Sequence, residues 1–167
     1  ALLSTFLPGY RTRHPNVDVH IIEDGGSRLA ERLENGDVHL AYVPADIERF
    51  AGVPLFPIHV VVAAPAEIGK LRSIEITKLG QQPLIVLRRG FGSRDWFDDA
   101  CHSAGVRPPI ALESGSHGVV MELVRAGYGV GILPSAVPPR EHVRFVPVVH
   151  NGRAIGRWTM LAWSRRR

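Results

Sequence analysis

The sequence predicts an α/β fold with largely parallel sheets, and two observations lead to this prediction. Along the 167 residues, short apolar runs alternate with stretches in which apolar residues recur at helical spacing. The short runs are typical of buried strands, and the second pattern is typical of amphipathic helices. Strands and helices that alternate in this way form mostly parallel sheets, because each helix returns the chain to the start of the next strand. The length suits one domain or two small lobes.

Two helices are predicted in the first third of the chain. The first begins near Leu2, is expected to bend at Pro8 and stops before Pro15, because proline disfavours helical geometry in the residue before it. Ser27 is expected to cap the second helix with its hydroxyl group. Gly36 is expected to end that helix, because glycine readily adopts the left-handed conformation found there.

Two further helices are predicted later in the chain. Ser93 is expected to cap one whose apolar face includes Phe97 and Cys101 and extends to Ala104. The other covers residues 116–126, and Gly127 ends it. The predicted buried face of this last helix consists of Val119, Val120, Leu123 and Val124.

The remaining apolar runs are predicted to be strands, with a loop at residues 44–52 and a short helix or turn at 74–79. The predicted strands are residues 17–22, 38–43, 58–64, 84–87, 110–112, 130–133, 143–149 and 158–164.

Composition and charge exclude several classes of protein. The chain is 45% hydrophobic and 22% charged, as is ordinary for a globular domain that buries a core without disulfides. Cys101 is the single cysteine, which excludes an internal disulfide framework and favours a reducing, cytoplasmic setting. No apolar run is long enough to span a membrane, and residues 1–6 do not resemble a signal peptide. The net charge of +4 is mostly scattered, so it does not indicate a nucleic-acid surface.

No pattern of residues indicates catalysis, a cofactor or a metal site. The eight histidines and the cysteine do not occur at the spacing of a zinc site. The chain also lacks a nucleophile elbow, a phosphate-binding loop and a dinucleotide fingerprint. Cys101 lies on an apolar helix face and is expected to be an inert core residue. We therefore expect a binding protein without enzymatic activity, without a cofactor and without a metal.

Three segments resemble the effector-binding domain of LysR-type bacterial transcriptional regulators. Residues 2–17 are similar to the family's first helix, which ends in an F-R-x-x-Y-P-x-V pattern. Residues 33–42 are similar to the pattern L-x-x-G-x-h-D-h-A-h, where h is hydrophobic, although His39 stands where the family most often has aspartate. Residues 124–134 are similar to V-x-x-G-x-G-h-x-h-h-P, and their glycines are expected to allow close packing between a helix and the next strand. The three segments occur in the family's order and span nearly the whole chain.

The resemblance implies two Rossmann-like lobes joined by two crossing strands, a type 2 periplasmic-binding-protein-like fold. The first lobe would comprise residues 1–62 and 160–167, and the second lobe residues 63–159. The crossings would lie near residues 58–65 and 158–164. A small-molecule effector would bind in the cleft between the lobes. The resemblance also implies that the chain is truncated at both ends, without the family's first strand, its final helix and its DNA-binding domain.

The segment after the strand at 84–87 is the strongest candidate for a ligand site. Ligands of open α/β sheets bind beyond the carboxyl ends of strands, and the N–H groups at a helix start attract anions. An arginine can hold a carboxylate with two parallel hydrogen bonds, and Phe91 can supply an apolar wall. Adjacent extended residues point to opposite sides, so only one of the two arginines is expected to face the ligand. The candidate residues are Arg88, Arg89, Gly90, Phe91, Gly92 and Ser93. The alternative is an exposed basic loop in which Ser93 is only a helix cap.

The loop after the strand at 110–112 is expected to face the same site. Ser114 and Ser116 offer hydroxyl groups, and His117 is either a ligand contact or a solvated residue of the first helical turn. Val43 and Pro44 follow a strand of the other lobe and are expected to border the cleft from that side.

The expected partners follow from these residues and from the resemblance. The ligand is expected to be a small anionic effector, with a carboxylate favoured. The family implies a homodimer, here through residues 2–10 and the helix that contains residues 97–104, and a tetramer for the full-length protein. DNA would be bound only through a missing helix-turn-helix domain, and no membrane is expected. A solute-binding protein of a transport system is the alternative, because it shares the two-lobe fold.

Overall fold

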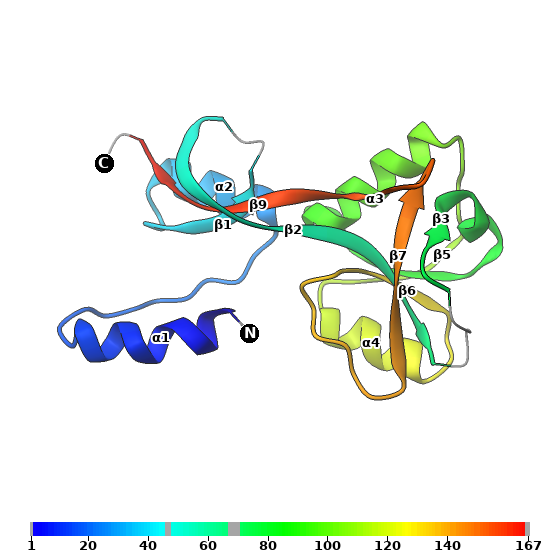
Figure 1. Cartoon of the computed structure of the whole chain (residues 1–167), viewed down its shortest axis with the longest axis horizontal. Coiled ribbons are helices and arrows are strands. Elements are labelled where there is room, and N and C mark those ends of the chain that lie inside the picture. Colours follow the sequence, from blue (N-terminus) through cyan, green and yellow to red (C-terminus); the bar gives the residue numbers. More distant parts are fainter. Residues whose placement is uncertain (1, 46–47, 67–70, 166–167) are drawn as a thin grey trace.

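The computed structural model describes residues 2–45, 48–66 and 71–165 of the chain. Two lobes are joined by β2 (Phe50–Pro65) and β9 (Gly156–Ser164), which run antiparallel to each other (Figure 1). The helix α1 (Leu2–Arg13) lies apart from both lobes in this view. The predicted α/β fold with two lobes and two crossing strands is therefore confirmed.

In the first lobe, one helix packs on one face of a small antiparallel sheet. The strand order is β1 (Ala41–Pro44), β9 and the first part of β2. The helix α2 (Gly26–Asn35) supplies Ala30 and Leu33 to the core. The core consists of Ala30, Leu33, Ala41, Val43, Phe50, Met160 and Ala162. The sheet is antiparallel because β2 leaves the lobe and β9 returns to it, so the expectation of largely parallel sheets is wrong here.

The sheet of the second lobe combines parallel and antiparallel pairs. β4 (Leu84–Leu87) is parallel to both β5 (Ile110–Ser114) and β6 (Val130–Pro134). The end of β2 is antiparallel to β6 on one side and to β7 (Val143–His150) on the other. The lobe is completed by β3 (Ile74–Glu75), the 3-10 helix η1 (Ile76–Gln81) and β8 (Arg153–Ala154).

Two helices cover opposite faces of this sheet, and alternate residues of β2 point to the two sides. Val60 and Val62 lie in one core with Phe97 of α3 (Gly92–Ser103). Val61 and Ala63 lie in the other core with Val120 of α4 (His117–Arg125). β2 pairs with β9 as far as His59, and from Val60 onward it pairs with β6 and then also with β7. The exact lobe boundaries stay a prediction.

The glycine helix ends are confirmed. Gly36 has a φ of 82° and ends α2, and Gly127 has a φ of 78° just after α4. The N–H of Tyr128 donates to the carbonyl of Leu123, and that of Gly127 donates to Val124, which together satisfy the end of α4. Gly129 allows the backbone to pass close to Pro83, because a Cβ at position 129 would lie 2.4 Å from the carbonyl oxygen of Pro83.

Three details of the predicted helices are wrong. α2 begins one residue before Ser27, with Gly25 at its N-cap, and α3 has Phe91 rather than Ser93 at its N-cap. Ser93 is buried at 5% exposure in the first turn of α3. Val119 is 48% exposed, and Met121 is buried in its place. Each error is a shift of one or two positions, which sequence periodicity does not resolve.

The predicted strand at residues 17–22 is absent, and this segment is exposed coil between α1 and α2 (Figure 1). A strand forms only beside a partner, and no described strand pairs with these residues. The alternation of apolar residues is real, but Val17, Val19 and Ile21 are left 47–53% exposed. Two boundaries also differ: β1 begins three residues later than expected, and residues 50–52 of the expected loop belong to β2.

We predict that Gly131→Ala destabilises the second lobe. A Cβ at Gly131 would lie 2.9 Å from the Cγ atoms of Val120 and Val124, both fully buried. Overpacking of this kind costs about 1–3 kcal/mol of unfolding free energy, measurable by urea denaturation. Gly80→Ala is the matched control, because no atom lies within 4 Å of the added methyl group. Equal stability of the two variants would contradict this helix–strand packing.

Candidate functional site

The loop between β4 and α3 holds the predicted ligand residues in a tight turn. Gly90 has a φ of 93°, which favours glycine, and its N–H donates to the Asp95 carboxylate over 3.4 Å. The carbonyl of Phe91 accepts from the N–H groups of Arg94 and Asp95. Helix α3 therefore starts directly behind Phe91 and fixes the direction in which the loop projects.

The loop between β5 and α4 lies against the first loop. The N–H of Arg88 donates to the carbonyl of Ser114 over 2.9 Å. The Ser114 hydroxyl accepts from the N–H of Ser116, whose own hydroxyl caps α4 by accepting from Val119. The rings of Phe91 and His117 meet edge to face, with centroids 5.5 Å apart. The structure thus brings both predicted loops together at the end of the parallel strands.

The first lobe meets these loops through residues that the sequence analysis did not assign to the site. A Cβ on Gly25 would lie 2.0 Å from the carbonyl oxygen of Gly90, so the two lobes touch at this point. The charge of Glu23 acts on His117 across the same junction. The signal was present, because the Gly25-Gly26 pair follows a strand-like run and opens a helix, as Gly90 and Gly92 do.

The three arginines of residues 88–94 lie in three different environments. Arg88 lies against the second loop, since a Cβ on Gly115 would be 3.2 Å from its Cζ and Nε atoms, and its Cζ is 6.0 Å from the Phe91 ring centre. Within the described part of the chain, the Arg88 guanidinium has no hydrogen-bond or ion-pair partner. Arg89 points elsewhere, with an 83% exposed side chain 3.8 Å from the Asp98 carboxylate.

Arg94 is buried and does not face the ligand site. Its Nη1 donates to the carbonyl of Leu87 over 2.6 Å and to Glu113 over 2.8 Å, and its Nε donates to Asp98 over 2.9 Å. Burial lowers the pKa of this guanidinium, but the hydrogen bonds and charges of Asp98 and Glu113 outweigh burial and raise it overall. Arg94 is therefore a permanent buried charge beneath the loop.

The other predicted site residues are divided between the junction and the protein interior. Pro44 lies near the start of α2, 3.8 Å from where a Cβ on Gly26 would stand. The side chain of Val43 is 1% exposed in the first-lobe core, and Ser93 is buried behind the loop. Gly92 packs closely against Trp96. We define the junction site as Arg88, Phe91, Ser114, Ser116 and His117, with Gly25 opposite.

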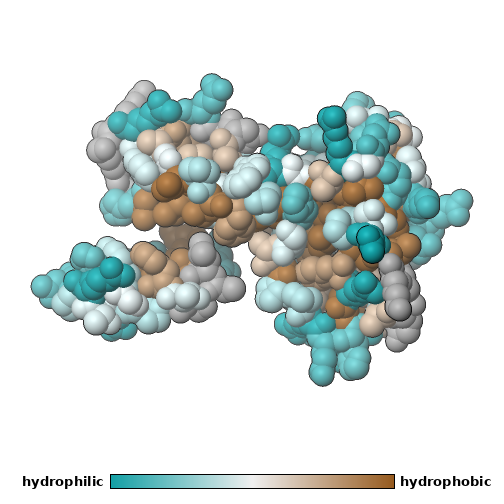
Figure 2. All heavy atoms as spheres, viewed as in Figure 1, coloured by the Kyte–Doolittle hydropathy of each residue, from teal (hydrophilic) through white to brown (hydrophobic). Residues whose placement is uncertain are grey.

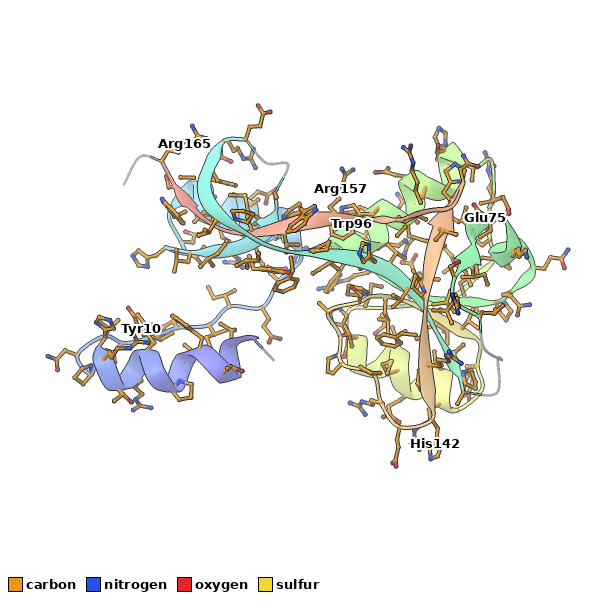
Figure 3. All side chains as sticks on the ribbon, viewed as in Figure 1. Tyr10, Glu75, Trp96, His142, Arg157 and Arg165 are labelled. Atoms are coloured by element: carbon orange, nitrogen blue, oxygen red, sulfur yellow. The ribbon has the colours of Figure 1, made fainter. Side chains whose placement is uncertain are left out.

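Two hollows are found on the described residues, and one of them shares a residue with the junction site. One of about 360 Å³ is lined by Ala45, Gly156, Arg157 and Trp158, beside the crossing strand β9. Figure 3 labels Arg157 where β9 passes between the lobes. The other, of about 540 Å³, lies along the outer side of α4 and shares only Ser116 with the site. It is lined by Val119, Leu123 and Ala126 and by the ion pairs of Glu122 with Arg125 and Arg140.

Metal-binding groups and the single thiol bear on the chemistry that the described residues can support. Among residues 2–45, 48–66 and 71–165, no three histidine, cysteine or acidic side chains are grouped as a metal would require. Cys101 is 7% exposed, and burial together with the charge of Asp98 raises the pKa of its thiol to about 11. The thiolate is the reactive form, so Cys101 is inert near neutral pH. No helix in the described ranges is long and apolar enough to cross a membrane.

The family of this chain is identified by its match to a known domain. A family described as "LysR substrate binding domain" matches residues 1–167. The chain belongs to this family. Among curated relatives, a "Probable hydrogen peroxide-inducible genes activator" of Mycobacterium avium is 31% identical over 148 residues, covering 86% of this chain and 48% of the relative. The LysR domain described here thus spans about half the length of the curated relatives it matches.

Solved structures show the same fold at low sequence identity. The regulatory domain of CcmR from Synechocystis, solved with 2-PG, is 20% identical with a TM-score of 0.84, covering 99% of this chain and 83% of that one. The effector-binding domain of QuiR, solved with shikimate, is 18% identical with a TM-score of 0.77, covering 99% and 81%. These LysR domains share the two-lobe architecture.

We predict that His117 makes stability dependent on pH. Burial lowers the pKa of His117 below its ordinary 6.5, and the charge of Glu23 partly opposes this. The unfolded chain therefore binds protons more readily than the folded chain. The stability that the neutral His117 ring contributes is fully present above about pH 6.5, and it is lost as the pH falls through that value toward the folded pKa. The unfolding free energy measured between about pH 7.5 and 5.5 should fall less steeply in His117→Gln than in the wild type.

Glu23→Gln provides the matched comparison, because it removes the charge that favours the protonated imidazole. This variant should lose stability more steeply over the same pH range. If both variants kept the wild-type dependence of unfolding free energy on pH, the burial of His117 would not be the cause of the pH-dependent stability.

Proposed function

We propose that this LysR domain is the effector-sensing part of a transcriptional regulator, and that it binds a small carboxylate or phosphate at the junction site. The observation that carries the proposal is the Arg88 guanidinium, held against Gly115 and Phe91 without an ion-pair partner in the described residues. A planar guanidinium of this kind matches a carboxylate or phosphate with two hydrogen bonds. The relatives solved with 2-PG (2-phosphoglycolate) and with shikimate both hold small acids.

Each residue of the junction site would contribute in a distinct way. Arg88 would pair with the anionic group, and Phe91 with the edge of His117 would pack against its carbon skeleton. The Ser114 hydroxyl accepts from the Ser116 N–H and so shapes the neighbouring loop, and the Ser116 hydroxyl, which accepts from Val119, would donate to the ligand and fix its orientation. Gly25 and Glu23 come from the first lobe, so a bound ligand would sense how the two lobes are arranged.

The alternatives have weaker support. The transport-protein alternative is not favoured, since the curated relatives are transcriptional regulators. The names of the two mycobacterial relatives suggest peroxide sensing, but in this chain the single cysteine is buried with a raised thiol pKa. We also propose that the domain performs no catalytic turnover, works in the cytoplasm, and meets DNA only through a separate helix-turn-helix domain.

The proposed dimer surface uses a different helix of the second lobe from the one that the sequence predicts. The apolar side of α3 is buried, with Phe97 at 1% and Cys101 at 7% exposure, so it is not available for an interface. α4 instead carries the exposed Val119 and the 540 Å³ hollow. Figure 2 shows hydrophobic surface on the second lobe and on the side of the first lobe that faces α1. We propose a homodimer in which α1 and residues 17–22 of one copy cover α4 of the other.

We predict that Arg88→Ala weakens binding of 2-phosphoglycolate or shikimate about tenfold to a hundredfold, because a charge-assisted contact is lost. Isothermal titration at constant ionic strength measures the effect. Arg89→Ala is the matched control, since the neighbouring side chain points toward Asp98 and should leave affinity nearly unchanged. Wild-type affinity in Arg88→Ala, or binding of neither acid by the wild type, would refute the proposed ligand class at this site.

We predict that Val119→Asp shifts a dimer toward monomer, because it places a charge in the proposed apolar contact. Light scattering from micromolar to near-millimolar protein concentration gives the oligomeric state. His102→Asp, on the exposed side of α3, should remain dimeric. A wild-type protein that stays monomeric over this range would exclude the homodimer for this chain.

A further inference from the structure

The buried guanidinium of Arg94 connects the ends of the two strands that carry the junction site. Its Nη1 binds the last carbonyl of β4, at Leu87, and the carboxylate of Glu113 near the end of β5. Its Nε binds both carboxylate oxygens of Asp98 on α3 over 2.9 and 3.0 Å. One side chain that is 3% exposed therefore joins three elements.

The position of this cluster relates it to the ligand loops. Leu87 immediately precedes Arg88, and Glu113 immediately precedes Ser114. The hydrogen bond from the Arg88 N–H to the Ser114 carbonyl lies one residue beyond the two groups that Arg94 holds. The spacing between the loops, and so the placement of the Arg88 side chain over Gly115, depends on how these strand ends are held.

Stability alone does not account for a buried charge at this position. Burying a guanidinium has a desolvation cost that ion pairs only partly offset, and well-packed apolar residues often serve stability equally well. A planar fork with several donors, in contrast, fixes the relative positions of its acceptors. Arg94 has this geometry, with acceptors on a strand carbonyl and on two carboxylates from different elements.

We infer that Arg94 is a positioning residue of the junction site, which holds the ends of β4 and β5 so that Arg88 is presented to an anionic ligand. The inference rests on the proposed function. Arg94 does not contact the ligand, and it acts through the backbone of Leu87 and the side chain of Glu113. It differs from Arg88, which supplies the charge, and from Arg89, which lies outside.

The test compares Arg94→Met, Glu113→Ala and the control Asp99→Ala. Glu113 has a 47% exposed side chain, so its removal leaves no cavity and the variant should fold even if Arg94→Met does not. Asp99 is the exposed neighbour of Asp98 on α3, and within the described part of the chain Arg94 makes its ion pairs with Asp98 and Glu113 and none with Asp99. Amide hydrogen exchange is followed by NMR at Arg88 and, for comparison, at β2–β6 pairs such as Val61 with Leu133.

Both test variants should exchange the Arg88 amide roughly tenfold faster than the wild type, beyond any change at the β2–β6 amides. They should also bind 2-phosphoglycolate more weakly, and Asp99→Ala should match the wild type in both measurements. Exchange at Arg88 that rises only as much as at β2–β6 shows a purely structural role and overturns the inference. If the wild type does not bind 2-phosphoglycolate, the proposed ligand fails, while the exchange comparison still decides the role of Arg94.

Discussion

The continuity of β2 through both lobes is the constraint on which the rest of the structure depends. Its first part pairs with β9, and from Val60 onward it pairs with β6 and β7. Because one strand belongs to both sheets, the carboxyl ends of β1, β4 and β5 are directed to a common junction. The starts of α2, α3 and α4 follow those strand ends or face them, and the contact between Gly25 and Gly90 results. The position of the candidate site, with loops of both lobes around it, is thus a consequence of strand pairing.

The elements with strong local signals could be predicted from the sequence, and those that depend on a distant partner could not. Apolar periodicity identified α3, α4 and their neighbouring strands, and glycines identified the ends of α2 and α4, since these patterns are set within each segment. Residues 17–22 have the same alternation as a strand but no partner among the described strands, so alternation alone was insufficient. In the candidate site, the closeness of the two second-lobe loops could be predicted, because the carboxyl ends of neighbouring parallel strands lie at the same edge of a sheet. The contact between Gly25 and Gly90 could not be predicted, because it depends on how the two lobes meet.

The arginines of residues 88–94 show how burial assigns different functions to one residue type. Arg89 is exposed and forms a long ion pair of the kind that contributes little to stability. Arg94 has its charge neutralised within the protein by Asp98 and Glu113. Arg88 alone of the three lies beside the second loop without a carboxylate partner in the described residues, so its charge remains available to a ligand. Composition shows a basic cluster here, and only the geometry separates these functions.

Helix α4 connects the proposed ligand site with the proposed dimer surface. It begins at His117, whose ring packs against Phe91, and two residues later it exposes Val119 on its outer side. A ligand that binds more tightly to one position of His117 and Ser116 would bias the position of this nine-residue helix. The packing of Gly131 against Val120 and Val124 leaves little space for the helix to tilt independently of β6. A shift at the ligand end of α4 would therefore move its outer face as a unit, and a contact with a second copy on that face would respond to the ligand.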